Sequence, residues 1–315
     1  ERRELRMENP WKKIYKGVRS GERFIVAESD KPYIEEFLDN KKYVPKEEHK
    51  LHFNMLSQQF IGNILKAKVI FLSNNPRYDD DYLDQYLHAN GYEDIVENNL
   101  KLAPSAKFHA FDLSLEKRGK YWSDKFKVWF PEEVSEKVRL NELRVNSPEE
   151  FGKKEKELND KLDEFFTENI AIVDFLPYYS LLFDKKCEKL ANKDYLPTQK
   201  FVFEILKERI EDENDDVVII LLRGRSLWHK AVPGLENYKE RYHVTSWQNP
   251  SIRPECILDV SKNHVKEKIE QLIEKIKKIK QKENPSVFLV FFVTSFIHTI
   301  KRFFILIILY HLIHT

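Results

Sequence analysis

Glycine and cysteine are both scarce in this chain of 315 residues, and each scarcity removes a class of function. Only 8 glycines are present, and no P-loop, GxGxxG or GxSxG motif occurs, which excludes the usual phosphate cradles and the nucleophile elbow of hydrolases. The two cysteines, Cys187 and Cys256, belong to no CxxC motif or His/Cys cluster. We therefore expect no zinc or other metal, no cofactor and no disulfide framework, and a reducing cytoplasmic location.

Acidic residues are missing from the last thirty positions. Residues 286–315 hold Lys301 and Arg302 but no acid, and 20 of the 30 are apolar. The two basic residues split them into runs shorter than the roughly 20 residues of a bilayer-spanning helix. Three interpretations stay open, namely one kinked span, an interfacial hairpin and out-of-frame translation, so membrane contact is expected only if this tail is a native segment.

The charge balance of the remaining chain shows no basic excess. Of the 53 basic residues, 51 lie in residues 1–285, against 52 acidic residues. Nucleic-acid-binding proteins usually have a basic surplus, so any contact with DNA must come from a local patch. We expect Met7 to be the natural start and residues 1–6 to derive from upstream sequence; no signal-peptide pattern follows Met7.

Four short apolar runs predict the central architecture. Residues 69–72, 170–173, 217–222 and 242–245 each read as a buried strand, and helical patterns such as 198–210 separate them. Such alternation predicts a three-layer α/β/α fold with a central four-stranded parallel sheet. We assign this domain to residues 51–260 and expect residues 1–50 to pack on it.

Other local patterns predict elements around this sheet. Residues 24–27 suggest a short strand, residues 32–38 a short helix and residues 60–62 a turn. Asp79 and its two acidic neighbours are expected to cap a following helix rather than bind metal.

Two longer helices follow from capping and periodicity. Ser147 with Glu150 forms a capping box, with proline at the first helical position, which predicts a helix start. Residues 261–285 form a charged segment whose apolar residues have a heptad-like spacing too short for a coiled coil, so packing on the sheet is expected.

An aromatic-rich segment spans residues 104–131. Most of its rings should belong to the core, but one or two are expected to line a pocket and stack on a flat ligand. They are Phe108, Phe111, Tyr121, Trp122, Phe126, Trp129 and Phe130.

Polar residues follow each predicted strand where it ends. Right-handed crossovers place the carboxyl ends of parallel strands at one edge of the sheet, which is where open α/β sheets bind ligands. Asn75, Asp174, Arg223 or Arg225, and Asn249 would then converge on one crevice. The alternative for the first of these loops, Ser73 to Pro76, is an ordinary polar turn.

Taken together, these four strand ends resemble the uracil-DNA glycosylase superfamily over roughly residues 55–260. Ser73-Asn-Asn-Pro76 is similar to the family's Gly-x-Asp/Asn-Pro motif after its first strand, and Asn249-Pro-Ser251 is similar to the His-Pro-Ser or Met-Pro-Ser motif. Asp174 lies near the position of the family's base-reading asparagine. Leu222-Arg-Gly-Arg225 resembles the family's Gly-Lys stretch after strand three.

The resemblance implies a role for each of these residues. Asn75 would hold the hydrolytic water, and Asn249 would donate its amide N–H to the departing base. Pro76, Pro250 and Ser251 would grip the DNA backbone, the serine by bonding a phosphate.

Several other residues have both a possible binding role and a purely structural alternative. Arg223, Arg225 and Arg253 would supply charge near phosphates, or are simply surface arginines. Tyr178 or Trp247 would stack on the base, or belongs to the core.

The sequence departs from the family pattern at several of these positions. Ser73 stands in place of the first glycine, Arg77 follows the proline, and Asn249 stands in place of the base-contacting histidine. At the reading position, an ionised Asp174 accepts hydrogen bonds and cannot donate to uracil O4, so it suits an amino-bearing base edge better.

Three classes of function remain open at this stage. The favoured one is a DNA glycosylase that hydrolyses the N-glycosidic bond of a flipped modified or damaged base. The second is a catalytically silent sensor that binds a base, a nucleotide or a DNA end on the same fold. The third is a small-molecule hydrolase that uses the acids of the crevice, chiefly Asp174.

Overall fold

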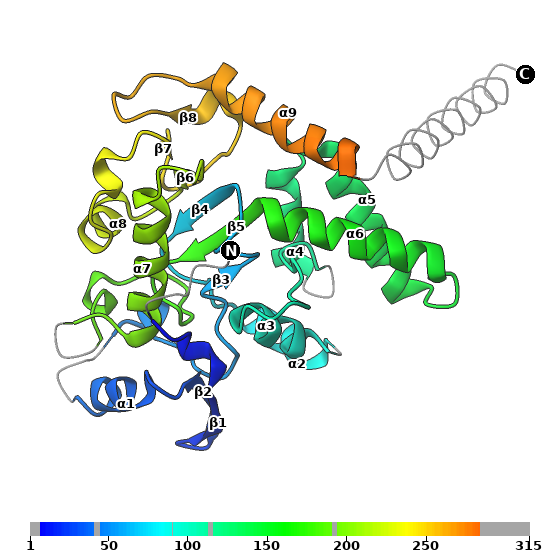
Figure 1. Cartoon of the computed structure of the whole chain (residues 1–315). Coiled ribbons are helices and arrows are strands. Elements are labelled where there is room, and N and C mark those ends of the chain that lie inside the picture. The colour runs from blue at the N-terminus through cyan, green and yellow to red at the C-terminus, as the bar shows by residue number, and fades with distance from the viewer. Residues whose placement is uncertain (1–6, 41–44, 90, 113–115, 191–193, 284–315) are drawn as a thin grey trace, which may run out of the picture. The chain divides into compact units, whose positions relative to one another are not determined.

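The computed structural model of the chain describes residues 7–40, 45–89, 91–112, 116–190 and 194–283 (Figure 1). The chain divides into two units, residues 1–266 and 267–315.

The first unit is built on a six-stranded, mostly parallel sheet with the strand order β3-β5-β4-β6-β7-β8. Its central strands are β5 (Ile170–Asp174), β4 (Val69–Ser73), β6 (Val218–Leu221) and β7 (Arg241–Val244), and neighbouring members of this group are parallel. Two-residue strands, β3 (Phe60–Ile61) and β8 (Ile257–Leu258), pair antiparallel at the edges. The predicted α/β class is confirmed, but the sheet has six strands rather than four.

Both faces of the sheet are covered by apolar side chains. On one face, Phe71 of β4 packs against Phe126, the last residue of α4 (Glu116–Phe126), and against Trp129. On the other face, Leu72 shares a buried cluster with Phe203 of α7 (Pro197–Glu211) and Trp228 of α8 (Arg225–Ala231). Strand side chains alternate between faces, and Figure 1 shows helices on either side of the sheet.

The remaining elements of this unit surround the sheet. The hairpin of β1 (Ile14–Arg19) and β2 (Glu22–Ala27) precedes α1 (Lys31–Asp39). The other helices are α2 (Asp80–His88), α3 (Tyr92–Leu100), α5 (Pro131–Asn146) and α6 (Lys153–Asn169). The described residues also form the short 3-10 turns η1 (Pro10–Lys12), η2 (Glu47–His49), η4 (Lys185–Cys187), η5 (Leu235–Asn237) and η6 (Pro254–Cys256).

The N-terminal segment packs into the same core. Trp11 is fully buried, its ring lies 6.3 Å from that of Tyr178, and its Nε1 donates to Gln59 Oε1 at 2.8 Å. Through these contacts, residues from the first fifty positions contribute to the core of the sheet-bearing unit.

The turn predicted at residues 60–62 is instead the edge strand β3. Phe60 and Ile61 are both buried, and Phe60 pairs with Val173. Gly62 follows with φ of +88°, and a Cβ there would overlap the carbonyl oxygen of Ile170. Glycine is therefore needed for the close approach of this strand to β5.

The predicted helix start at Ser147 is also wrong. Helix α5 runs up to Asn146, and Glu150 N donates to Ser147 O at 2.9 Å, so this stretch is a turn between helices. The next helix, α6, begins only at Lys153. The acidic cap of α2 is confirmed, because the Asp79 side chain accepts from Asp81 N at 3.1 Å.

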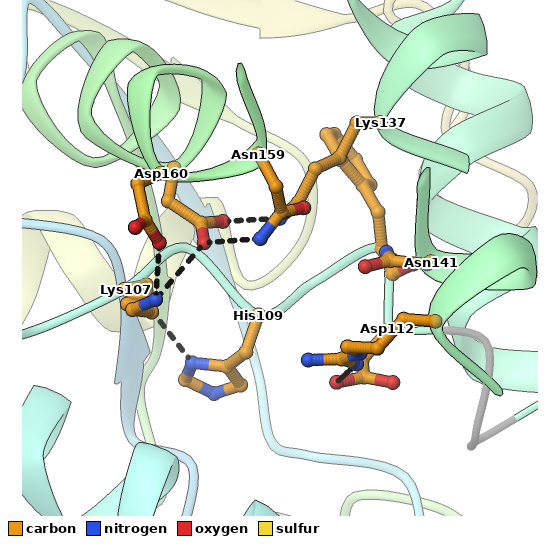
Figure 2. A network of polar contacts seen from close by, with 10 residues as sticks. Lys107, His109, Asp112, Lys137, Asn141, Asn159 and Asp160 are labelled. Carbon is orange, nitrogen blue, oxygen red and sulfur yellow. Dashed lines mark hydrogen bonds and ion pairs between the residues drawn. The ribbon is translucent and has the colours of Figure 1, made fainter. Parts of the chain in front are cut away.

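A polar network ties the aromatic segment to α5 and α6 (Figure 2). Buried Lys137 of α5 contacts Asp163 and Asn159 of α6, each at 2.6 Å. Lys107 pairs with Asp160 at 2.7 Å, which holds the start of the aromatic segment on α6. Because partners surround both ends of the Lys137–Asp163 pair, we interpret this network as structural.

The second unit contains α9 (Lys266–Glu283) from its second residue onward. The helix begins five residues later than the charged helix predicted from Ser261. Within the described residues, no helix combines the length and apolar character needed to cross a membrane. The apolar tail predicted at 286–315 lies outside these residues.

Candidate functional site

A cavity of about 440 Å³ opens at the carboxyl edge of the four central strands. It receives residues from the loops after β4, β6 and β7 and from the last residue of β5, and helices α2 and α4 complete its wall. The lining residues are Ser73, Asn75, Pro76, Arg77, Asp79, Tyr82, Gln85, Tyr121, Trp122, Asp174, Leu222, Arg223 and Pro250. Its size falls within the range typical of small-ligand sites.

Asn75 is held in one orientation by its amide nitrogen. Nδ2 donates to Ser180 Oγ at 2.9 Å, to Ser180 O at 3.0 Å and to Pro76 O at 3.1 Å. Backbone carbonyls only accept, so this contact assigns the nitrogen side of the amide without ambiguity. The side-chain oxygen Oδ1 is then the acceptor that Asn75 retains for a ligand or a water in the cavity.

Asp174 reaches the cavity from the neighbouring strand. It is the last residue of β5 and pairs in register with Ser73 of β4, two positions before Asn75. Its backbone nitrogen donates to Gln59 O at 2.7 Å, which fixes the strand end, and the residue is buried. Adjacent parallel strands thus bring Asn75 and Asp174 into one cavity.

Two aromatic residues of α4 form another part of the wall. Tyr121 is 38% exposed, whereas Trp122 is buried, and their ring centroids lie 5.1 Å apart. Burial raises the pKa of the Tyr121 hydroxyl; Arg223 acts against this rise, while the carboxylate of Asp174 adds to it. The hydroxyl therefore remains protonated at neutral pH, beside a carboxyl group and a guanidinium.

The loop after β7 is fastened to the rest of the site by side-chain donors. Arg223 donates from Nε to Trp247 O at 3.1 Å and from Nη2 to Gln248 O at 3.2 Å. Trp129 Nε1 donates to Ile252 O at 2.6 Å, and Lys125 Nζ donates to Pro250 O. These bonds place Pro250 at the cavity wall.

The structure separates the nine predicted site residues into groups. Asn75, Pro76, Asp174 and Arg223 line the cavity. Ser251 and Trp247 lie on the adjacent loop but do not line it; Trp247 is 69% exposed, so the core alternative for this residue is wrong.

Three predicted placements need correction. Tyr178 has no exposed surface, and its hydroxyl donates to Asp30 at 2.8 Å, so it is a core residue and not a stacking platform. Asn249 is exposed and outside the cavity, because Pro250 turns inward in its place. Arg225 begins α8 and is likewise absent from the cavity wall.

Helix α2 contributes residues that the sequence analysis did not assign to the site. The N-cap residue Asp79 and two helical residues, Tyr82 and Gln85, line the cavity. The spacing of three places Tyr82 and Gln85 on one face of the helix. Tyr82 is both buried and part of the wall. The sequence did contain a signal for this wall: two polar residues, Asp79 and Gln85, each lie three positions from Tyr82.

A second, more open groove of about 750 Å³ lies over α2, α4 and α5. Its wall is mostly charged and amide side chains, and it contains no residue from a strand end. In the described part of the chain, no group of three or more His, Cys, Asp or Glu side chains is arranged to hold a metal ion.

Comparison with protein-family models, with curated proteins and with solved structures finds no match to this chain.

Proposed function

We propose that the protein is a DNA base glycosylase that hydrolyses the N-glycosidic bond of a modified or damaged base flipped out of the helix. The observation that carries the proposal is that Asn75 and Asp174 line one cavity at the carboxyl edge of the sheet. These are two of the positions at which the sequence resembles the uracil-DNA glycosylase superfamily. A flipped base needs such a pocket with polar groups for its edge and aromatic groups for its faces.

Asn75 would position the attacking water. Its Nδ2 is occupied by Ser180 and Pro76, so Oδ1 is presented as an acceptor for a water proton. A neutral amide orients water but is too weak a base to deprotonate it, so its contribution is one of placement.

Donors already in the cavity would stabilise the departing base. The resemblance implied this role for Asn249, which lies outside the cavity, whereas Arg77, Arg223 and Tyr121 line it. A guanidinium is a stronger partner for a developing anion than an amide N–H is.

Asp174 would read the edge of the base. An ionised carboxylate accepts from an amino group and repels a carbonyl, so the preferred substrate would carry an amino-bearing edge. Asp174→Asn should then shift the preference toward a uracil-like edge, by up to ~10⁴-fold where a site depends on such complementarity. Release ratios from paired oligonucleotides measure the shift; identical ratios in both proteins would remove Asp174 from this role.

The test of the function itself is a search for released bases. Purified protein is incubated with genomic and phage DNAs that carry different base modifications, and free bases are identified by mass spectrometry. Alkali-labile abasic sites should appear in the same DNAs. If no DNA yields a free base or an abasic site, the glycosylase proposal fails.

A second candidate function is a base or nucleotide sensor without turnover. It is favoured by the exposure of Asn249 outside the cavity and by the absence of a carboxylate at position 75. A sensor would bind the modified DNA or its free base saturably and leave the DNA intact, so a binding assay run beside the mass analysis separates the two functions.

A further inference from the structure

Four cationic or ionisable side chains gather at α8 and β7, apart from the cavity wall. Arg225 and His229 belong to α8, and Arg241 and His243 belong to β7. Arg241 and His243 are two positions apart on a strand, so they point to the same face of the sheet. That face also carries Leu221, which pairs in register with His243.

The turn η5 shows that the helix and the strand converge. Arg241 Nη2 donates to Glu236 O at 2.9 Å, and His229 Nδ1 lies 3.9 Å from the carboxylate of the same Glu236. One residue of η5 therefore contacts both sides of the group. Arg225, at the start of α8, is exposed.

Three buried nitrogen atoms of this group have no hydrogen-bond partner. They are His229 Nε2, Arg241 Nε and His243 Nδ1. Arg241 is only 5% exposed, and a buried polar atom without a partner costs about 1–3 kcal/mol. Arg241 Nε is always a donor, and each of the two histidine nitrogens donates when its imidazole is protonated or in one neutral tautomer. A hydrogen-bond acceptor would therefore suit all three atoms.

The local charge indicates the sign of that partner. The pKa of His243 is lowered by burial and by the charges of Arg225 and Arg241, against the opposite pull of Asp259. Lys262 adds to the lowering. For His229, burial and then Arg241 lower the pKa, with Glu236 opposing. Positive charge thus outweighs the nearby acids, and both imidazoles are driven toward their neutral form.

We propose that Arg225, His229, Arg241 and His243 form a binding site for an oxyanion of the phosphate type. An anion would accept from the orphaned nitrogens and offset the repulsion among the arginines. It would also favour protonation of both imidazoles, so binding should strengthen as the pH falls from 7 toward 6. The site is separate from the proposed base pocket and does not depend on the proposed function.

The test is a titration of the full-length protein with inorganic phosphate. The imidazole NMR signals of His229 and His243 are the readout of phosphate binding. Both signals should move saturably, and phosphate should raise both imidazole pKa values. Arg225→Gln should weaken phosphate binding about tenfold, the effect of losing one charge-assisted hydrogen bond. Arg225 is exposed, so this variant should fold.

Lys230→Gln is the matched control, because it removes one positive charge from the same helix while Lys230 pairs instead with Glu188 at 2.8 Å. It should bind phosphate as the unaltered protein does. Equal weakening in both variants, or histidine signals that chloride moves as much as phosphate at equal ionic strength, would overturn the proposal. So would signals that do not respond at all, which would indicate buried water only.

Two arms then identify the source of the oxyanion. A short DNA duplex that moves the same histidine signals and competes with phosphate identifies a backbone phosphate of DNA. A duplex that leaves them unchanged while phosphate still binds identifies a free phosphate or phosphorylated small molecule. Both results support the site.

Discussion

Asp30 is a fully buried carboxyl that accepts three hydrogen bonds at the start of α1. Its Oδ2 accepts from Tyr178 at 2.8 Å and from Thr198 Oγ1 at 2.5 Å, and its Oδ1 accepts from Thr198 N at 3.1 Å. Burial raises its pKa from 3.8 to about 6, although these bonds oppose the rise. The folded protein therefore binds a proton that the unfolded chain has already released, across the window between these two values.

This pKa gives a signed prediction for stability. The contribution of Asp30 should be greatest below about pH 4 and should be lost as the pH rises to about 6, by about 3 kcal/mol. Asp30→Asn should lack this slope, so the stability of the original protein relative to the variant falls from pH 4 to pH 7. Urea unfolding at four pH values measures the difference.

Asp194→Asn serves as the contrasting control. Lys200 lowers the pKa of Asp194 by a side-chain hydrogen bond, so that group stabilises the protein more as pH rises. A relative stability of Asp30→Asn that does not change with pH would contradict the account of Asp30.

Gly224 joins β6 to α8 in a conformation that other residues avoid. Its φ is +66°, and a Cβ there would overlap Asn74 Oδ1 in the loop that leads to Asn75. Gly224→Ala should cost the left-handed penalty of about 1–2 kcal/mol and a further overpacking term of about 1–3 kcal/mol. Gly21 also has a positive φ, +87°, but a Cβ there would meet open space. Gly21→Ala should therefore cost only the left-handed penalty. Thermal unfolding compares them, and equal losses would argue against the contact with Asn74.

Among individual site residues, the sequence predicted those attached directly to strand ends. Asn75 and Asp174 could be placed because a strand end fixes where the next side chains go. Asn249 could not, because its loop is positioned by Trp129, Lys125 and Arg223, which are distant in the chain. Nothing in local sequence shows which residue of such a loop turns inward.

Two buried indole groups hold the loops on either side of the cavity. Trp129 Nε1 donates to Ile252 O at 2.6 Å, and Trp228 Nε1 donates to Ser73 O at 3.0 Å. The first bond anchors the loop after β7, and the second anchors the end of β4. Trp129 and Trp228 therefore help to determine the shape of the site, each through one indole N–H donor.

Trp129→Phe and Trp228→Phe form a matched pair of variants. Trp129→Phe should lose about 1–3 kcal/mol of stability, because Ile252 O loses its donor. Trp228→Phe should lose less, because Ser73 O also accepts from Phe175 N at 3.1 Å. Hydrogen exchange should accelerate in residues 249–253 only for Trp129→Phe, and in residues 73–77 only for Trp228→Phe. Acceleration of both loops by either change would mean that the two loops unfold together.

Elements with continuous apolar sequence were predicted well, and others were not. The four central strands are buried on both faces, which produces a readable run of apolar residues. The two-residue strands β3 and β8 are too short to leave any period. Helix α5 was missed because its buried face includes Glu133, Lys137 and Asn141 beside apolar residues, so its pattern is not amphipathic.

For the molecule as a whole, residues 1–285 have nearly balanced charge, so attraction to DNA cannot come from net charge. Positive groups are instead local, with Arg77 and Arg223 at the cavity and Lys125 nearby. Burial and Arg223 lower the pKa of Lys125, which reflects how closely these cations are grouped. Such a patch would allow contact with the DNA backbone at one place on the surface.

In the proposed function, the cavity releases bases from DNA with a water that Asn75 holds. The most direct test is single-turnover base release by the unaltered protein, Asn75→Ala and Asn249→Ala on a DNA that the base search identifies. Asn75→Ala should slow release by about 10²–10⁴ with DNA affinity nearly unchanged, whereas Asn249→Ala should differ little from the unaltered protein because Asn249 is outside the cavity. From the sequence alone, Asn75→Asp is expected to retain or raise activity, because a carboxylate can hold water and stabilise a cationic sugar. The contacts in the structure reverse this expectation: the variant should be slowed, since a carboxylate would face the carbonyls of Ser180 and Pro76 without a donor. Full release by a folded Asn75→Ala protein would contradict the claim.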